Sequence, residues 1–214
     1  SMVGSEISYN GEAQTDATIS LNEGWNIIGG IQDTVAVSAI EDPNGIRSSA
    51  DIFEHNGGSY DVASEIKPTR GYWIHASQAG DISLSAQSSA KPTEKKSVAS
   101  SATDRIQFSS GGDTQFFFIA KDQVDEAFRN RYRMPPEAPN PTLDIRTADG
   151  FRLADKKTKK LNISARSYPI TVSVPEETAS AFILKGITDR DTVRYQLSKG
   201  ESTSVAHPHE TYIL

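Results

Sequence analysis

Cysteine is absent from the 214 residues of the chain. This absence excludes a disulfide framework, a thiol nucleophile and a thiolate metal site. It does not decide where the protein works, because a chain without cysteine suits a reduced cytosol and equally a secreted protein that is stabilised by packing alone.

Long apolar runs are also missing. No stretch approaches the roughly 18 apolar residues of a membrane-spanning helix, and the first residues do not resemble a signal peptide. We therefore expect no membrane insertion. The chain begins with Ser1-Met2, which resembles the remnant of an expression tag, and ends at Tyr212-Ile213-Leu214, which has the composition of a strand interior. Both ends lead us to expect a piece of a longer protein, in which case the missing signal peptide is uninformative.

The chain lacks an excess of positive charge. Its formal net charge is −6 and its pI is near 5.3, which argues against nucleic acid as a partner because that affinity rests mostly on clustered Lys and Arg. The one basic run, residues 156–160, is predicted to be a solvated hairpin loop rather than an anion site. Hydrophobic residues make up only 36% of the chain, which favours two modest cores over one thick core.

What the sequence does contain is a series of short strand-like segments closed by turn residues. In the first part of the chain they recur about every ten residues, with turns at residues 42–45 (DPNG) and 55–58 (HNGG) and a further predicted strand at Val35–Ile40. This pattern predicts a small all-β module, sandwich or barrel-like, over residues 17–84. Residues 1–16 lack periodicity and are predicted to form a disordered arm that includes the tag remnant.

A change in composition divides the chain in the middle. Residues 85–103 are rich in Ser, Ala and Lys, contain no aromatic residue and are predicted to be a linker. Residues 104–214 predict an antiparallel β-sandwich of roughly eight strands, with Gly111-Gly112 as its strongest hairpin signal. Within it, the prolines of Asp122–Thr142 predict an irregular connection, and no apolar stripe at helical spacing is found. The expected fold class is all-β, with two small β domains.

Both tryptophans lie in matching fragments, residues 24–29 (GWNIIG) and 71–74 (GYWI). They could form a platform for a sugar ring, but the preferred interpretation is that Trp25 and Trp73 are buried core anchors. In the run Phe116–Phe118, neighbouring side chains point to opposite faces, so either both faces are covered or Phe117 is exposed to a partner. A carbohydrate-binding or adhesion module would require exposure of at least one aromatic residue among Tyr60, Tyr72, Trp73 and Phe117.

Histidine residues provide two candidates for chemistry. His207 and His209 lie two residues apart, so in a strand they would share a face and could reach one metal ion if Glu201 or Glu210 completed the site, although the intervening proline is more typical of an edge or turn. His75 is in register with Trp73, but no Ser or Asp partner for a catalytic triad is recognisable.

Acidic loops are the remaining candidates. Asp122 and Asp125, and likewise Asp189 and Asp191, could supply hard oxygen ligands to calcium, although the spacing of a helix-loop-helix calcium site is absent. Paired carboxylates could serve a glycosidase, but nothing in the sequence places two of them in one cleft. No phosphate-binding loop is present. We therefore expect no catalytic residue, no cofactor and no metal site beyond these weak calcium candidates.

The first region resembles a repeat-like module of large secreted surface proteins of Bacteroidetes-type bacteria. The resemblance covers about residues 17–84 and is carried by Gly24-Trp25-Asn26-Ile27-Ile28 and Pro68-Thr69-Arg70-Gly71-Tyr72-Trp73-Ile74. The second region looks like the β-sandwich that commonly follows it, through Asp122, Asp125, Tyr132, Pro135-Pro136, Pro139 and Asp144-Ile145-Arg146. The resemblance implies secretion, a place ahead of a type IX sorting signal, and no assigned catalytic residues.

These observations lead us to expect a non-catalytic accessory region of a secreted or cell-surface bacterial protein. It would present or space an upstream domain, and its partners would be other domains of the same polypeptide. The alternative is a carbohydrate-binding or adhesion module that uses exposed aromatic residues.

Overall fold

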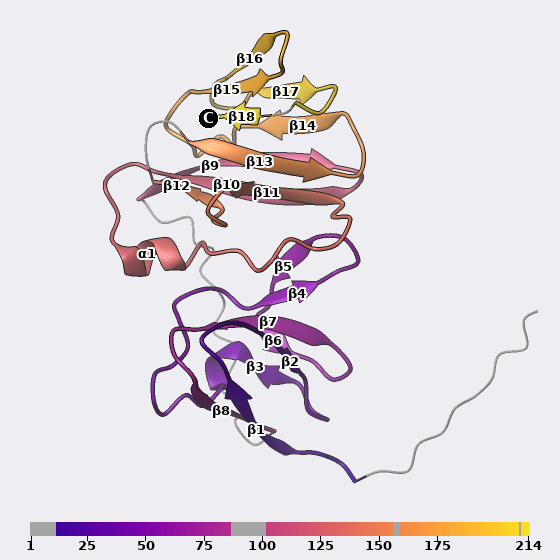
Figure 1. The fold of residues 1–214 in the computed structure, drawn as a ribbon, viewed down its shortest axis with the longest axis vertical. Helices are drawn as coiled ribbons and strands as arrows, with labels where there is room; N and C mark the ends of the chain where they lie inside the picture. Colours follow the sequence, from indigo (N-terminus) through magenta and orange to yellow (C-terminus); the bar gives the residue numbers. More distant parts are fainter. Residues whose placement is uncertain (1–11, 87–101, 156–158, 210) are drawn as a thin grey trace, which may run out of the picture.

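The computed structural model describes residues 12–86, 102–155, 159–209 and 211–214 (Figure 1). The chain is nearly all-β, with 49% of residues in strands and 4% in helix, which confirms the predicted fold class. We refer to residues 12–86 as the first unit and to residues 102–214 as the second unit. Most of the predicted arm and most of the predicted linker lie outside the described residues. Of the predicted arm, residues 12–15 precede the first strand.

The first unit is built around a four-stranded antiparallel sheet in the order β2-β7-β4-β5, with two smaller strand pairs, β1-β8 and β3-β6. The elements are β1 (Asp16–Leu21), β2 (Gly24–Gly29), β3 (Val35–Ala36), the 3-10 turn η1 (Val37–Ala39), β4 (Phe53–His55), β5 (Tyr60–Val62), β6 (Glu65–Ile66), β7 (Gly71–Ala76) and β8 (Gly80–Ser85). The predicted strand at Val35–Ile40 is therefore wrong beyond its first two residues. There the backbone turns, so that Ala39 and Ile40 both reach the core.

The second unit is a sandwich of two five-stranded sheets, ordered β12-β10-β9-β14-β17 and β11-β13-β18-β15-β16 (Figure 1). All pairs are antiparallel except β10 with β12. The elements are β9 (Thr103–Ser110), β10 (Asp113–Ala120), α1 (Glu126–Asn130), β11 (Leu143–Thr147), β12 (Leu153–Ala154), β13 (Lys160–Ala165), β14 (Ile170–Ser173), β15 (Phe182–Ile187), β16 (Thr192–Leu197), β17 (Ser202–Val205) and β18 (Thr211–Ile213). The hairpin predicted at Gly111-Gly112 joins β9 to β10, as expected.

Helix α1 corrects one sequence prediction, because it lies in the connection that was expected to be irregular. It begins after Asp125, whose carboxylate accepts a hydrogen bond from the backbone N–H of Phe128 at 2.7 Å. This N-cap satisfies one of the free donors of the first turn, so a helix of a single turn forms without an apolar stripe.

The aromatic run of β10 covers both faces of its sheet. Phe117 is fully buried in the core between the two sheets, whereas Phe118 packs on the opposite face against Tyr132 and Leu153. Of the two possibilities for this run, the structure therefore has both faces covered. Among the described residues, no helix is long and apolar enough to cross a bilayer.

Candidate functional site

The outer face of the four-stranded sheet in the first unit is aromatic. The register places Trp25 opposite His75, and both Ile27 and Phe53 opposite Trp73. Directly opposed residues of antiparallel strands lie on the same face. The ring centroids of Trp25 and Trp73 are 6.4 Å apart with perpendicular planes, and Trp25 also packs edge-on against His75 at 5.1 Å.

Neither tryptophan is a core anchor, so that interpretation is wrong. On β7 the core positions belong to Tyr72 and Ile74, each 1% exposed, and strand alternation turns Trp73 to the opposite face, where it is half-buried. The hydroxyl of Tyr72 accepts a hydrogen bond from the backbone N–H of Lys67 at 2.8 Å. Tyr72 is thus buried and bonded, and the prediction of its exposure as a binding aromatic is wrong.

Of the other proposed binding aromatics, Phe117 is also buried, at 0% exposure, and cannot contact a ligand. Tyr60 and Trp73 are both half-buried on the aromatic face. The Tyr60 hydroxyl donates a hydrogen bond to the backbone carbonyl of Pro136 at 3.0 Å. The polar end of Tyr60 is therefore already occupied by the second unit.

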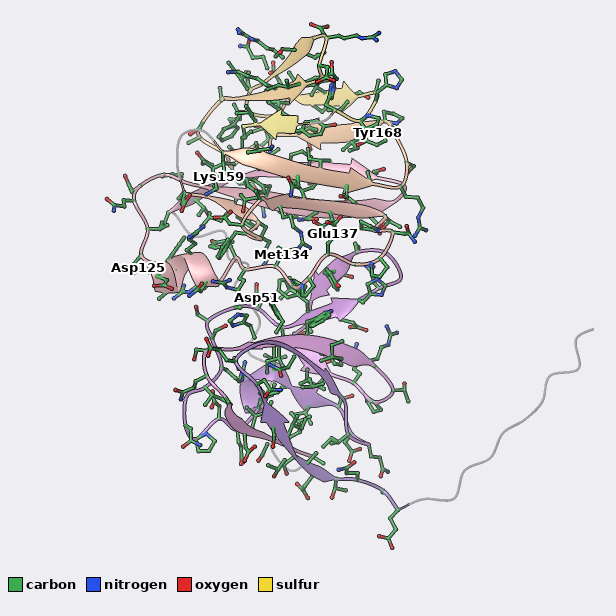
Figure 2. All side chains as sticks on the ribbon, in the orientation of Figure 1. Asp51, Asp125, Met134, Glu137, Lys159 and Tyr168 are labelled. Carbon is green, nitrogen blue, oxygen red and sulfur yellow. The ribbon has the colours of Figure 1, made fainter. Side chains whose placement is uncertain are left out.

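The second unit covers part of the aromatic face and closes a junction between the two units (Figure 2). Phe53, in the middle of that face, is completely buried. At the tip of the β4-β5 hairpin, the backbone N–H of Thr142 donates to the carbonyl of Gly58 at 2.7 Å. A Cβ atom added at Gly58 would lie only 2.3 Å from the Thr142 side chain. Glycine is therefore required at this position for the two backbones to approach each other.

Arg152 lies at the centre of the junction. Its guanidinium donates to the Asp51 carboxylate at 2.6 Å and lies 5.4 Å from the ring of Phe53 and 5.6 Å from the ring of Phe118. Burial lowers the pKa of Arg152, and the nearby Asp51 acts in the opposite direction. Because an arginine starts from a pKa above about 12, it stays charged here and forms a partly desolvated ion pair between two aromatic rings.

The connection that reaches the junction is held by a buried ion pair. On β11, Asp144 accepts from the Nε atom of Arg146 at 2.5 Å, and the Nη1 atom of Arg146 donates to the carbonyl of Pro135 at 2.6 Å. Burial raises the pKa of Asp144, while Arg146 opposes that shift. Two motifs of the second region, the paired prolines and Asp144-Ile145-Arg146, are thus in direct contact.

A second ionic cluster fixes helix α1 to the sandwich. Arg129 forms ion pairs with Asp149 and, at 3.3 Å, with Asp155, and Lys159 pairs with the same two carboxylates at 3.6 and 3.0 Å. Partial burial acts to raise the pKa of Asp155, but its hydrogen bond to Lys159 and the charges of Lys159 and Arg129 outweigh this, so the pKa is lowered. The end of the basic run is therefore in an ionic network, and residues 156–158 lie outside the described residues.

The histidine candidates lie in separate environments. His75 packs against Trp25. Burial and the charge of Arg133 lower the pKa of His75 and outweigh the opposing effect of Glu23, so the ring is neutral at neutral pH. The Nε2 atom of His209 lies 3.0 Å from the Tyr195 hydroxyl, whereas His207 is exposed.

The calcium candidates occupy turns. Asp125 is the N-cap described above, and Asp191 accepts a hydrogen bond from Thr192 in the tight turn between β15 and β16. Asp122 and Asp189 are exposed. Across the described ranges, no group of three His, Asp or Glu side chains is arranged to hold a metal ion.

One cavity brings two carboxylates to the same place. It has a volume of about 710 Å³, lies at one end of the sandwich, and is lined by residues that include Asp122 and Asp155. A glycosidase would need one of them protonated near neutral pH, yet the pKa of Asp155 is lowered and its charge is balanced by Lys159 and Arg129. Asp155 therefore does not have the electrostatics of a catalytic acid.

In comparisons with known proteins, the sequence matches no family model, no curated protein and no solved structure. The resemblance to bacterial surface modules therefore rests on the residue motifs alone. Sequence reasoning did not identify four of the residues that form the junction, namely Asp51, Gly58, Thr142 and Arg152. Their only visible signal was the hairpin glycine pair at 57–58, because a contact between distant segments leaves no local pattern.

Proposed function

We propose that the chain is a non-catalytic accessory region of a secreted or cell-surface bacterial protein, and that it spaces or presents an upstream domain. The observation that carries the proposal is the docked junction. A spacer must keep a fixed length, and the Arg152–Asp51 ion pair together with the Thr142–Gly58 backbone hydrogen bond ties the two units together at two separate points. Secretion and a type IX sorting route belong to the same proposal and are supported by the residue motifs.

The absence of natural cysteine makes the spacer proposal directly testable. Cysteines placed at the exposed positions Gln78 and Lys199 can carry one spin label on each unit, and electron–electron resonance then measures the distribution of distances between them. We expect one narrow distribution. Substitution Arg152→Ala should broaden it, and Arg190→Ala, which removes an exposed arginine from the turn between β15 and β16, should not. A broad distribution in the unsubstituted chain would contradict a rigid spacer.

A carbohydrate-binding role is the second candidate, and one observation favours it. Trp25 and Trp73 are half-exposed on the outer face beside Ile27, which is 66% exposed. Because the two indole rings are perpendicular, they could stack on one sugar ring at a time but could not form a flat platform for a polymer. Glycan-array binding that is lost in Trp73→Ala and kept in Tyr195→Ala would support this role, and an array without signal would remove it.

A further inference from the structure

A row of three cations crosses the outer face of the β11-β13-β18-β15-β16 sheet. Lys160 on β13 and Lys185 on β15 both lie opposite Ile213 on β18, and Arg194 on β16 lies opposite Lys185. Opposed residues share a face, and neighbouring strands are about 4.8 Å apart, so the three charges form a short band across the sheet. We call Lys160, Ile213, Lys185 and Arg194 the cationic row.

The row faces away from the core. The residues that alternate with it, Leu161, Leu184 and Tyr212, are buried between the two sheets. Lys160 and Arg194 are exposed, and Lys185 is half-buried. None of the ion pairs found among the described residues involves a member of the row. Its charge is therefore available to an external partner.

The row is unfavourable for the sheet itself. Like charges that lie directly opposite each other destabilise an antiparallel pair, and Lys185 and Arg194 are such a pair. The turn between β15 and β16 contains Asp189 and Asp191, but within the described ranges neither forms an ion pair with the row. A local cost of this kind indicates a role outside the fold.

An apolar contact point accompanies these charges. Ile183 lies on the same strand and the same face as Lys185 and is 48% exposed. Beside it the surface is hollowed by the 710 Å³ cavity, whose lining includes Ile183, Lys185 and Ile213 and, farther from the row, the carboxylates of Asp122 and Asp155, the latter paired with Lys159 and Arg129. A surface of cations around an isoleucine suits a partner that is acidic and has an apolar residue of its own.

The first unit has both of these properties. Residues 12–86 contain eleven Asp and Glu against three Lys and Arg, a formal net charge of −8, whereas residues 102–214 contain fifteen against sixteen, a net charge of +1. Ile27 on β2 is the most exposed large hydrophobic residue in the described part of the chain, at 66%. Charge and apolar exposure are thus complementary between the two units.

We propose that the cationic row binds the first unit of a second copy of this chain, head to tail. Figure 1 shows the strands that carry the row following one another away from the first unit, with β16 farthest from it. Ile27 lies on β2 at the edge of the first-unit sheet, and the row lies on second-unit strands beyond β11, so we expect the two surfaces to meet between molecules. Such a contact is heterologous, so its repetition gives rings or open chains of molecules. The inference does not depend on the spacer role.

Sedimentation velocity of the full chain tests the proposal. At about 0.01 M salt charges act over roughly 30 Å, and at about 1 M over roughly 3 Å. We expect the sedimentation coefficient to rise with protein concentration at low salt and to return to the monomer value at high salt. A chain that stays monomeric at low salt across the concentration range overturns the proposal.

Substitutions identify the surfaces. The double substitution Lys185→Glu/Arg194→Glu disrupts the row, and Ile27→Lys disrupts the first-unit surface. Each of these two variants should raise the dissociation constant of self-association at least tenfold. A mixture of the two variants should form dimers, because one keeps an intact row and the other an intact first unit. A mixture that remains monomeric rules out a head-to-tail contact.

Arg131→Glu/Arg166→Glu is the matched control, since it makes the same charge change on exposed arginines of the second unit away from the row. It should associate like the unsubstituted chain. If it loses as much association as the row variant, only overall charge matters and the proposal fails. Pelleting with phosphatidylglycerol vesicles that depends on the row, without self-association, would assign the face to membranes and likewise overturn it.

Discussion

In the first unit a single four-stranded sheet carries apolar residues on both faces, whereas in the second unit two five-stranded sheets bury their inner faces against each other. The first sheet packs Tyr72 and Ile74 inward and leaves Trp25, Trp73 and Phe53 on its other side. Within the described part of the chain, the second unit covers part of that side. The comparison indicates a one-sided dependence, in which the first unit relies on the junction for burial of apolar surface and the second unit largely does not.

The largest expected effect is on stability, and it differs between substitutions on the two faces of β7. Tyr72→Ala removes a fully buried aromatic side chain and should lower the free energy of unfolding of the first unit by about 3–5 kcal/mol. Trp73→Ala, one residue further on the outer face, should cost clearly less because the indole is half-exposed. Urea unfolding, monitored by amide hydrogen exchange in the first-unit strands, measures both losses of stability. Equal losses would mean that the outer face is as well packed as the core.

The next effect tests whether the dependence is one-sided. Arg152→Ala removes the cationic partner of the Asp51 carboxylate at a half-buried site, which should cost about 3 kcal/mol, the lower end for a broken buried pair. Amide exchange should accelerate in the first unit much more than in the inner strands of the second. The double substitution Asp51→Ala/Arg152→Ala should recover part of the loss. Equal acceleration in both units would contradict the comparison.

Acid should act mainly on the second unit. Burial acts to raise the pKa of Asp104, but hydrogen bonds from Ser180 and Ala179 outweigh it and lower the pKa. For Asp149 burial is likewise outweighed, here by a hydrogen bond from Thr147. Nearby cations lower both pKa values further. Asp155 behaves in the same way. Because their folded-state pKa values are lowered, these groups stabilise the fold above the ordinary aspartate pKa of about 3.9.

That stability is lost as pH falls through the lowered values. We therefore expect the second unit to lose stability below about pH 4, in thermal unfolding scans from neutral to acid pH. Asp104→Asn should make the pH dependence shallower, whereas Asp81→Asn in the first unit should leave it unchanged. A second unit whose stability does not change on acidification would show that these ion pairs contribute little.

The smallest effect concerns helix α1. Asp125→Ala removes the N-cap and should destabilise the second unit by about 1 kcal/mol. Asp122→Ala, an exposed position just before the helix, serves as the control and should be neutral. If both substitutions had the same effect, general loop charge rather than capping would be responsible.

Sequence reasoning reached the elements that depend on local pattern. The alternation of apolar residues and the turn glycines predicted the fold class, the Gly111-Gly112 hairpin and a sandwich of antiparallel strands over residues 104–214. It failed where the same local pattern is compatible with two different structures. Trp25 and Trp73 lie in strands that have apolar residues on both faces. Alternation alone therefore could not tell which face packs into the core. The Arg152–Asp51 pair joins residues 101 positions apart, and no local signal predicts such a contact.

The placement of the two tryptophans has an optical consequence. Both lie in the first unit, on the face that the second unit partly covers, with their rings perpendicular and 6.4 Å apart. All indole emission of the chain therefore originates from one small area beside the junction, and the second unit is silent at those wavelengths. Opening of the junction would shift the wavelength of maximum tryptophan emission while the sandwich remained folded. The unlabelled protein therefore reports by its own fluorescence whether its two units are docked.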